Sequence, residues 1–536
     1  MNSQFNTNQV GKRRYKKRNL LIILFAFKAL AQQPDTIYLP DPLITEAYYK
    51  AAHQNVLAAV NPAVFEGYFS VCADGKGFGY GNTYPSLDGH QMSDALLWLG
   101  QINTVKANWD YVKSFQKPDG RLPIAILPAE AGKMIGPKNY QSEVDANGGL
   151  YTHWVPKDPL RALAGTTYIQ NADVIFRFTL DKQWLREQLP SIHLTADYLA
   201  SLISHEGAVG GAGYYIERPT RLEFDGVSQG HVADAFKRLA ALNLINGDHV
   251  AAKKYHTLAN RVTSYFQNKF WQGTQYAEYL HPEKGFIKGH GLTDVDWTAL
   301  ATGIASEKQK RILWPQLKNE KGFYYKGMPT GIATRPETYQ SWETTYADSQ
   351  DLAAMGRVWY VEAWARANMG DADGLISSIR AVSSAGRDSS YYWRERYNAN
   401  GGYGAKKYNE YPANLIRIVQ RFLLGVEHGL DGSLQLSPTA PEAFWKTGFG
   451  QTLSLRNGTL TYLMKTRVTE GRYEGKGPQR LSVRFPHAAK NIRILINEQT
   501  VTPKIKDKWI TLLLPATKKG KPSTFSIRIL DDSEDQ

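Results

Sequence analysis

A repeated pairing of helical segments limits most strongly how this chain of 536 residues can fold. Apolar residues recur at helical spacing in about twelve segments, joined alternately by tight links such as INGDH and MGDAD and by longer loops rich in Gly and aromatic residues. Short turns on one side and long loops on the other are typical of helical hairpins closed into a ring, with the long loops gathered at one end. We expect helices near residues 43–60, 90–102, 105–117, 158–178, 182–204, 228–245, 248–270, 293–304, 306–318, 348–369, 371–385 and 410–428.

The pattern changes after residue 432. Apolar and polar residues alternate in LSVRFP, IRILIN and WITLLLP, and turn residues recur in NG, GKGP and KKGKP. This alternation predicts a small antiparallel β-sandwich over residues 433–536, whose expected role is to cover the helical part. Residues 32–432 form the predicted helical domain, so the predicted fold class is mainly α.

The first 31 residues have the composition of a secretory signal peptide. Six basic residues between Lys12 and Arg18 precede the apolar run LLIILFAF, and the small-residue sequence ALA follows. The apolar run is too short to span a bilayer. We therefore expect an exported chain that begins near Gln32, is periplasmic or extracellular, and has no stable membrane insertion. The single cysteine, Cys72, excludes an internal disulfide framework.

The net charge of +14 does not indicate a nucleic-acid partner. Residues 1–31 carry +7 and residues 441–536 carry +8, which leaves −1 for the rest of the chain. A nucleic-acid-binding domain would show its excess charge where it binds. We interpret the basic C-terminal part as a solvated face.

One segment, residues 388–412, combines aromatic rings, arginines and carboxylates with glycines that exclude a regular helix. Glu395 lies between Arg394 and Arg396, next to Trp393, and Glu410 opens the helix that follows. The sequence predicts a loop between two helices. An aromatic wall beside a carboxylate suits a sugar, because the ring packs on the aromatic face while the carboxylate binds a hydroxyl or a water. The alternative is a surface ion-pair network without chemistry.

Cleavage of a glycosidic bond requires two facing carboxyl groups, so we searched the long loops and helix starts for partners. Asp88 precedes a helix, Glu217 stands among tyrosines, and Glu343 follows Trp342. Two of them also have a structural interpretation: an N-cap for Asp88 and an arginine-paired turn acid for Glu217. Glu343 lies in a polar and aromatic loop that could hold sugar hydroxyls.

Other chemistries have weaker support. The sequence has no zinc-type His and Cys spacing, no Walker phosphate loop and no G-x-S-x-G elbow. His153, next to Trp154, is a possible base in a loop. We expect no metal and no cofactor.

The motifs resemble those of the six-hairpin (α/α)6 glycosidases, which include α-L-rhamnosidases, trehalases and processing-type α-glucosidases. YPSLDGHQMSDALLWLG followed by FQKPDGRLPI is similar to the rhamnosidase segment that carries the general acid, and the match falls on Asp88. YYIERPTR is similar to the acid loop of the trehalase branch and gives Glu217. WRERYN resembles the patch that bears the general base and gives Glu395, whereas NGGYGAKKYNEYP gives Glu410 as a rival base or a sugar ligand.

The resemblance implies an (α/α)6 toroid and an inverting glycoside hydrolase acting on an oligosaccharide or polysaccharide. The acid would be Asp88 or Glu217 and the base Glu395, with carboxyl groups about 6.5–9.5 Å apart. The residues expected to bind substrate are Trp393, Arg394, Arg396, Glu410, Trp342, Glu343, Trp154, His153, Tyr214 and His90.

Two alternatives remain open from sequence. A polysaccharide lyase acting on a uronate-containing glycan could use His153 or Tyr151 as base and Arg394 and Arg396 to neutralise the uronate. A carbohydrate-binding protein could keep the toroid without catalysis. The sequence leaves the oligomeric state open.

Overall fold

A computed structural model describes residues 36–60, 69–75, 86–124, 126–130, 133–134, 140–144, 149–154, 161–211, 213–214, 223–343, 352–398, 401–485, 491–502, 504–506, 508–518 and 520–530. Within 127–154, and at 86 and 223, it describes the backbone alone. The predicted signal peptide and Glu217 lie outside these residues. In the part of the chain that is described, no helix is both long and apolar enough to cross a membrane.

Six helices pack against one another in a closed series. α2 packs against α4, α4 against α6, α6 against α8, α8 against α10, α10 against α12, and α12 against α2. Most of their residues are buried, and every residue of α8 is, so α8 has little one-sided apolar pattern. Their bounds are α2 Ser86–Trp98, α4 Leu163–Thr179, α6 Gly226–Asn246, α8 Asp294–Ala301, α10 Gly356–Asn368 and α12 Glu410–Ile418.

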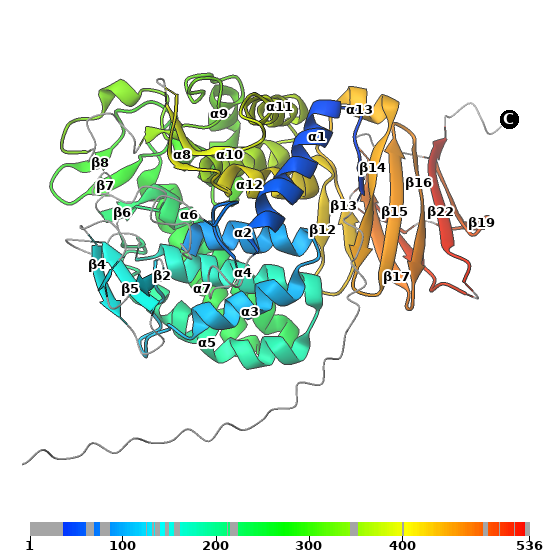
Figure 1. The fold of residues 1–536 in the computed structure, drawn as a ribbon, viewed down its shortest axis with the longest axis horizontal. Helices are drawn as coiled ribbons and strands as arrows, with labels where there is room; N and C mark the ends of the chain where they lie inside the picture. Colours follow the sequence, from blue (N-terminus) through cyan, green and yellow to red (C-terminus); the bar gives the residue numbers. More distant parts are fainter. Residues whose placement is uncertain are drawn as a thin grey trace, which may run out of the picture. The chain divides into compact units, whose positions relative to one another are not determined.

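The intervening helices have one buried and one exposed face and follow the tight links. Asp248 accepts a hydrogen bond from the Ala251 N–H at 2.9 Å, and Asp371 accepts one from the Gly374 N–H at 3.3 Å. These side chains satisfy N–H groups that a helix start leaves free. The helices are α1 Pro42–Lys50, α3 Ile102–Lys113, α5 Lys182–Ser201, α7 His249–Tyr265, α9 Glu307–Lys318 and α11 Ala372–Asp388. Helices therefore occur in all the predicted segments (Figure 1).

The last predicted segment is only partly helical. After α12 the chain continues as a π-helical turn, η6 (Val419–Leu423), and then enters strand β12 (Val426–His428), so the prediction of a helix to residue 428 is wrong. Gly425, at φ 66°, ends the helical run. A Cβ there would lie 2.1 Å from the Ser437 carbonyl carbon, so glycine allows the close approach of the chain.

Small antiparallel sheets occupy the long connections. Strands β2 (Ile126–Glu130), β3 (Lys133–Met134), β4 (Tyr140–Val144) and β5 (Gly149–Trp154) form one sheet before α4, and β6 (Glu223–Asp225), β7 (Tyr279–His281) and β8 (Gly285–Ile287) form another. A third contains β9 (Ala354–Met355), β10 (Arg394–Asn398) and β11 (Gly401–Lys406). The sequence predicted loops at these connections except at β9, which lies within the predicted helix 348–369, so the prediction of helix is wrong at residues 354 and 355.

Two larger sheets follow the helices. A seven-stranded sheet has the order β1-β14-β15-β16-β22-β18-β19, and a five-stranded sheet has the order β12-β13-β17-β21-β20. Strand β1 comes from the start of the described chain, and β13 runs parallel to β17, so the prediction of a purely antiparallel arrangement is wrong for that pair. The bounds are β1 Thr36–Tyr38, β13 Leu434–Leu436, β14 Phe449–Leu455, β15 Gly458–Lys465, β16 Val468–Gly475, β17 Gln479–Arg484, β18 Asn491–Ile496, β19 Gln499–Val501, β20 Lys504–Lys506, β21 Trp509–Leu514 and β22 Ser523–Leu530; a short helix, α13 (Glu442–Thr447), precedes β14.

Candidate active site

Glu395 occupies a β-bulge in the hairpin of β10 and β11. The register of the two strands shifts between Arg394 and Arg396, which leaves Glu395 between the paired residues. A bulge turns its side chain out of the regular alternation and is common beside active sites. The predicted loop between two helices is therefore a hairpin, and β9 pairs with its other side immediately before α10 begins.

The hairpin holds the Glu395 carboxylate in an ionised form. The carboxylate is 4% exposed and accepts hydrogen bonds from the Ala405 N–H and from Arg396 Nε, each at 3.0 Å. Burial opposes ionisation, but Arg396, the Ala405 N–H and the Arg357 charge together hold the pKa of Glu395 below its usual range. Gly404 makes room for this contact, because a Cβ there would lie 2.5 Å from Glu395 Oε2.

Asp88 lies in the first turn of α2, and its pKa is raised whereas that of Glu395 is lowered. It is 5% exposed, accepts a hydrogen bond from the Tyr408 hydroxyl at 2.9 Å, and lies 3.4 Å from Arg357 Nη2. Burial raises the pKa of Asp88 to about 7; Arg357 opposes this shift, whereas the charges of Glu410 and Glu395 add to it. Asp88 and Glu395 are therefore electrostatic neighbours, one able to hold a proton near neutral pH and the other ionised.

Arg357, at the start of α10, connects the two sides of this cluster. Its Nε and Nη2 donate to the Glu410 carboxylate at 2.8 and 3.0 Å, and its backbone N–H also donates to Glu410. Glu410 opens α12, so one guanidinium links the N-terminal ends of α2, α10 and α12. Glu410 is thereby held as a partner of Arg357. The sequence analysis did not find Arg357.

A second buried cluster includes the predicted residue Glu343. His290 Nδ1 lies 2.6 Å from Glu278 Oε2, and His290 Nε2 lies 3.4 Å from Glu343 Oε2. The Tyr279 hydroxyl donates to Glu343 at 2.7 Å, and the Tyr339 hydroxyl donates to Glu278 at 2.6 Å. Burial disfavours the imidazolium, but the two carboxylates outweigh it and raise the pKa of His290 to about 9. At neutral pH the cluster is a cation between two anions.

This arrangement predicts that the protein loses stability as the pH rises from about 6.5 to about 9. Because the folded state holds the His290 proton more tightly than the unfolded chain, the stabilisation is complete below the ordinary pKa of 6.5 and disappears through about 9. We expect a decrease of about 2–3 kcal/mol in the free energy of unfolding, measured by urea denaturation. The decrease should be absent in His290→Gln and present in the exposed control His249→Gln; an equal decrease in both variants would contradict the assignment.

The other predicted residues fall into three groups. Trp393 cannot offer a platform to a sugar because it is fully buried against Gly386, with its indole N–H on the Val382 carbonyl at 3.1 Å. Tyr214, stacked on His231, is also buried, so neither ring offers an exposed face in this structure. His90 is buried between the helices. Trp342 is 40% exposed and Arg394 is partly exposed. The structure does not describe the side chains of Trp154 and His153.

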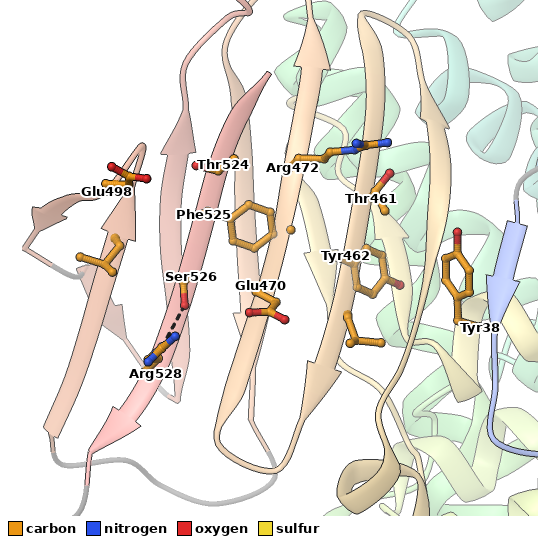
Figure 2. Close-up of a pocket in the computed structure, with 13 residues that line it drawn as sticks. Tyr38, Thr461, Tyr462, Glu470, Arg472, Glu498, Thr524, Phe525, Ser526 and Arg528 are labelled. Carbon is orange, nitrogen blue, oxygen red and sulfur yellow. Dashed lines mark hydrogen bonds between the residues drawn. The ribbon is translucent and has the colours of Figure 1, made fainter. Parts of the chain in front are cut away.

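A groove of about 700 Å³ also lies on one face of the seven-stranded sheet. Figure 2 shows Ser526 and Arg528 on one strand, joined by a hydrogen bond of 3.4 Å, with Glu498 and Tyr38 at opposite ends of the groove. Its carboxyl groups, Glu470 and Glu498, are exposed. We place the candidate chemistry at Asp88 and Glu395, where burial raises the pKa of Asp88 while Arg396, the Ala405 N–H and Arg357 lower that of Glu395.

Comparisons with known proteins bear on the fold alone. No model of a protein family and no curated protein matches the sequence. Among solved structures, the α-L-rhamnosidase of Dictyoglumus thermophilum is similar with a TM-score of 0.61 and 11% identity, over 92% of this chain and 50% of that one. A GH78 family rhamnosidase of Bacillus sp. GL1 gives 0.61 and 11% over 85% and 43%, and the Streptomyces avermitilis α-L-rhamnosidase complexed with L-rhamnose gives 0.56 and 12% over 92% and 42%.

The helices with their added sheets are therefore similar in fold to these solved α-L-rhamnosidases. More particularly, the fold is rhamnosidase-like, and the chain spans half or less of the length of these solved relatives.

Proposed function

We propose that this chain is a glycoside hydrolase that cleaves a glycosidic bond in an oligosaccharide or polysaccharide. The observation that carries the proposal is the pair of buried carboxyl groups, Asp88 and Glu395, with opposite protonation states beside Arg357 and Tyr408. The rhamnosidase-like fold supports it. Since the named relatives act on rhamnosides, α-L-rhamnosides are the first substrates to test.

The proposed reaction is a single displacement with inversion. Asp88 donates its proton to the leaving glycosidic oxygen while Glu395 takes a proton from a water that attacks the anomeric carbon from the opposite face. The C–O bond to the leaving group breaks, a C–O bond to water forms, and the two carboxyl groups exchange protonation states. Arg396 keeps Glu395 ionised before each turnover, and Arg357 holds Asp88 and Glu410 in place. Trp342, being exposed, could stack on a more distant sugar.

We also propose how the chain is divided into domains. The order in which α2, α4, α6, α8, α10 and α12 pack on one another supports an (α/α)6 barrel as the catalytic domain, within residues 32–432. The two larger sheets support a β-sandwich domain, with strand β1 as an N-terminal contribution. Export with removal of residues 1–31 is part of the same proposal.

The test is a screen of plant and microbial oligosaccharides, beginning with α-L-rhamnosides, with the anomer of the first product followed by NMR. We expect hydrolysis with a product anomer opposite to that of the substrate. A product of retained configuration would contradict the inverting mechanism. An unsaturated uronate product, or glycan binding without any turnover, would contradict the hydrolase proposal itself.

A further inference from the structure

A small polar cavity lies among the helices, next to the candidate active site but distinct from its carboxyl pair. It has a volume of about 50 Å³ and is lined from α2, α4, α6, α10, α12 and η6. This is several times the roughly 10–15 Å³ that one buried water requires. The lining residues on which the inference rests are His90, Asp94, Arg238, Arg357, Arg417 and Arg421.

The charged groups that line the cavity are mostly cations. Four arginines and one aspartate face it, and Asp94 is shared between Arg417 at 2.8 Å and Arg421 at 2.7 Å. The other two arginines have carboxylate partners outside the lining. Arg238 pairs with Asp234 at 2.6 Å and Asp173 at 2.7 Å, and Arg357 pairs with Glu410 and Asp88. Arginines therefore outnumber carboxylates in the lining of the cavity, and the carboxylates that pair with Arg238 and Arg357 lie outside that lining.

The charge balance of this network depends on the proton of Asp88. With Arg177, which pairs with Asp173 at 2.9 Å, the network contains five arginines. Its buried carboxylates are Asp88, Asp94, Asp173, Asp234 and Glu410, also five, so these buried groups and the arginines sum to zero when Asp88 is ionised and to +1 when Asp88 is protonated. Arg177 also lies 3.3 Å from Glu427, but that side chain is 58% exposed and water screens its charge. An uncompensated buried charge is strongly unfavourable.

The remaining titratable groups around Asp88 do not remove this imbalance. From β10, Glu395 is already paired with Arg396 at 3.0 Å; Tyr408 holds its own proton, because burial raises its pKa well above the ordinary value. Burial likewise raises the pKa of the nearby Cys72 thiol, which stays neutral. The +1 state of the network therefore has no counter-ion among these described side chains.

His90 adds a hydrogen-bond donor to the cavity. It is 7% exposed, and its Nδ1 is buried without a hydrogen-bond partner among the residues that the structure describes. Burial, assisted by Arg417, lowers the pKa of His90 to about 3, so the ring is neutral and can donate from one nitrogen. An unsatisfied buried donor beside partly open guanidinium groups is suited to an anion.

We propose that the cavity binds one small monovalent anion of the size of chloride or bromide, between His90 and the arginines, together with the proton of Asp88. Trp364 and Arg421 line both this cavity and a separate groove of about 620 Å³, so these two side chains stand between the cavity and the groove. The consequence for catalysis rests on the proposed function: the anion would keep Asp88 in its proton-donating form at higher pH.

The anion site is tested first without reference to activity. Crystals of the full chain, grown in sodium bromide at a pH below 7, should show an anomalous bromide peak in the cavity within reach of His90. The peak should disappear in His90→Phe, which removes the donor and fills space, and remain in His428→Phe. His428 is a matched control, because it is a half-buried histidine whose Nε2 is buried without a hydrogen-bond partner among the described residues, but it lies outside the lining of this cavity. Absence of a peak from wild-type crystals, with bromide bound elsewhere on the surface, would overturn the site.

The coupling between anion binding and the Asp88 proton is tested by measuring how activity depends on pH. Bromide at about tenfold its Kd should move the alkaline limb of the activity profile upward by about one pH unit relative to sodium gluconate, whose anion is too large for the cavity. The shift should be lost in His90→Phe. A bromide peak without a shift would support the anion site and overturn its coupling to the Asp88 proton, whereas the role of Asp88 as acid is tested by Asp88→Asn, so the two proposals fail separately.

Discussion

Glu395→Gln is expected to lower kcat by about 10²–10⁴-fold on any glycoside that the wild-type protein hydrolyses. The amide keeps the shape of the side chain and can still accept the Ala405 N–H bond through its oxygen, but it cannot take a proton from water. The measurement is kcat on the substrate found by the oligosaccharide screen, with the unfolding midpoint measured in parallel. A wild-type kcat in the variant would exclude Glu395 as the base.

The companion variant Asp88→Asn should give a different pH profile. In the wild-type protein, activity should fall as pH rises through about 7, because Asp88 loses the proton it must donate, and should fall in acid only below the usual carboxyl range, where Glu395 becomes protonated. The residual activity of Asp88→Asn should lack the alkaline limb, and that of Glu395→Gln should lack the acidic limb. Glu337→Gln, an exposed carboxyl in the same region of loops, serves as the control and should retain both limbs.

The helices were predictable because local chemistry specifies them. At the link INGDH, Gly247 adopts φ 84° and Asp248 caps α7, so the end of one helix and the start of the next are both encoded within five residues. The link MGDAD repeats this arrangement with Gly370 at φ 70° and Asp371. Such signals need no knowledge of distant contacts, which explains why the helical segments agree closely with the structure.

The hairpin of β10 and β11 was not predictable in the same way. Its strands contain Gly401, Gly402 and Gly404, residues that disfavour strands, and one edge of the sheet is supplied by Ala354 and Met355 far earlier in the chain. The same segment explains why Trp393 was misjudged. An aromatic residue beside a carboxylate looks like a platform, but Gly386 on α11 leaves a space that the indole fills.

Arg357 and His290 escaped the sequence analysis because their partners lie far away in the chain. Arg357 follows a glycine at the start of an apolar helix, and its partners Asp88 and Glu410 are 269 and 53 residues distant. His290 meets Glu343 only because the connection before α8 and the connection after α9 come to the same place. Function in this fold therefore depends on pairs that local patterns do not reveal, although the single carboxyl members, Asp88, Glu343, Glu395 and Glu410, could each be proposed.

Arg357→Met should have the largest effect on stability, about 3–5 kcal/mol in the free energy of unfolding at neutral pH. The guanidinium is buried and donates to the buried carboxylate Glu410 while lying 3.4 Å from Asp88. Methionine fills similar volume but leaves these acids without their counter-ion. The measurement is urea denaturation monitored by circular dichroism. Arg380→Met is the matched control, because Arg380 pairs with Asp41 at 2.7 Å while its side chain is 53% exposed, and such pairs contribute at most about 1 kcal/mol.

Two further measurements separate loss of charge pairing from loss of packing in Arg357→Met. The destabilisation should become smaller as pH falls below the pKa of the unpaired carboxyl groups, because a protonated acid needs no counter-ion, whereas a packing defect is independent of pH. The double variant Arg357→Met with Glu410→Gln should be more stable than the sum of the two single effects predicts, since the second change removes one unpaired charge. If the loss of unfolding free energy is independent of pH and the effects are strictly additive, Arg357 acts as a space-filling side chain. Charge pairing by Arg357 would then not stabilise the site.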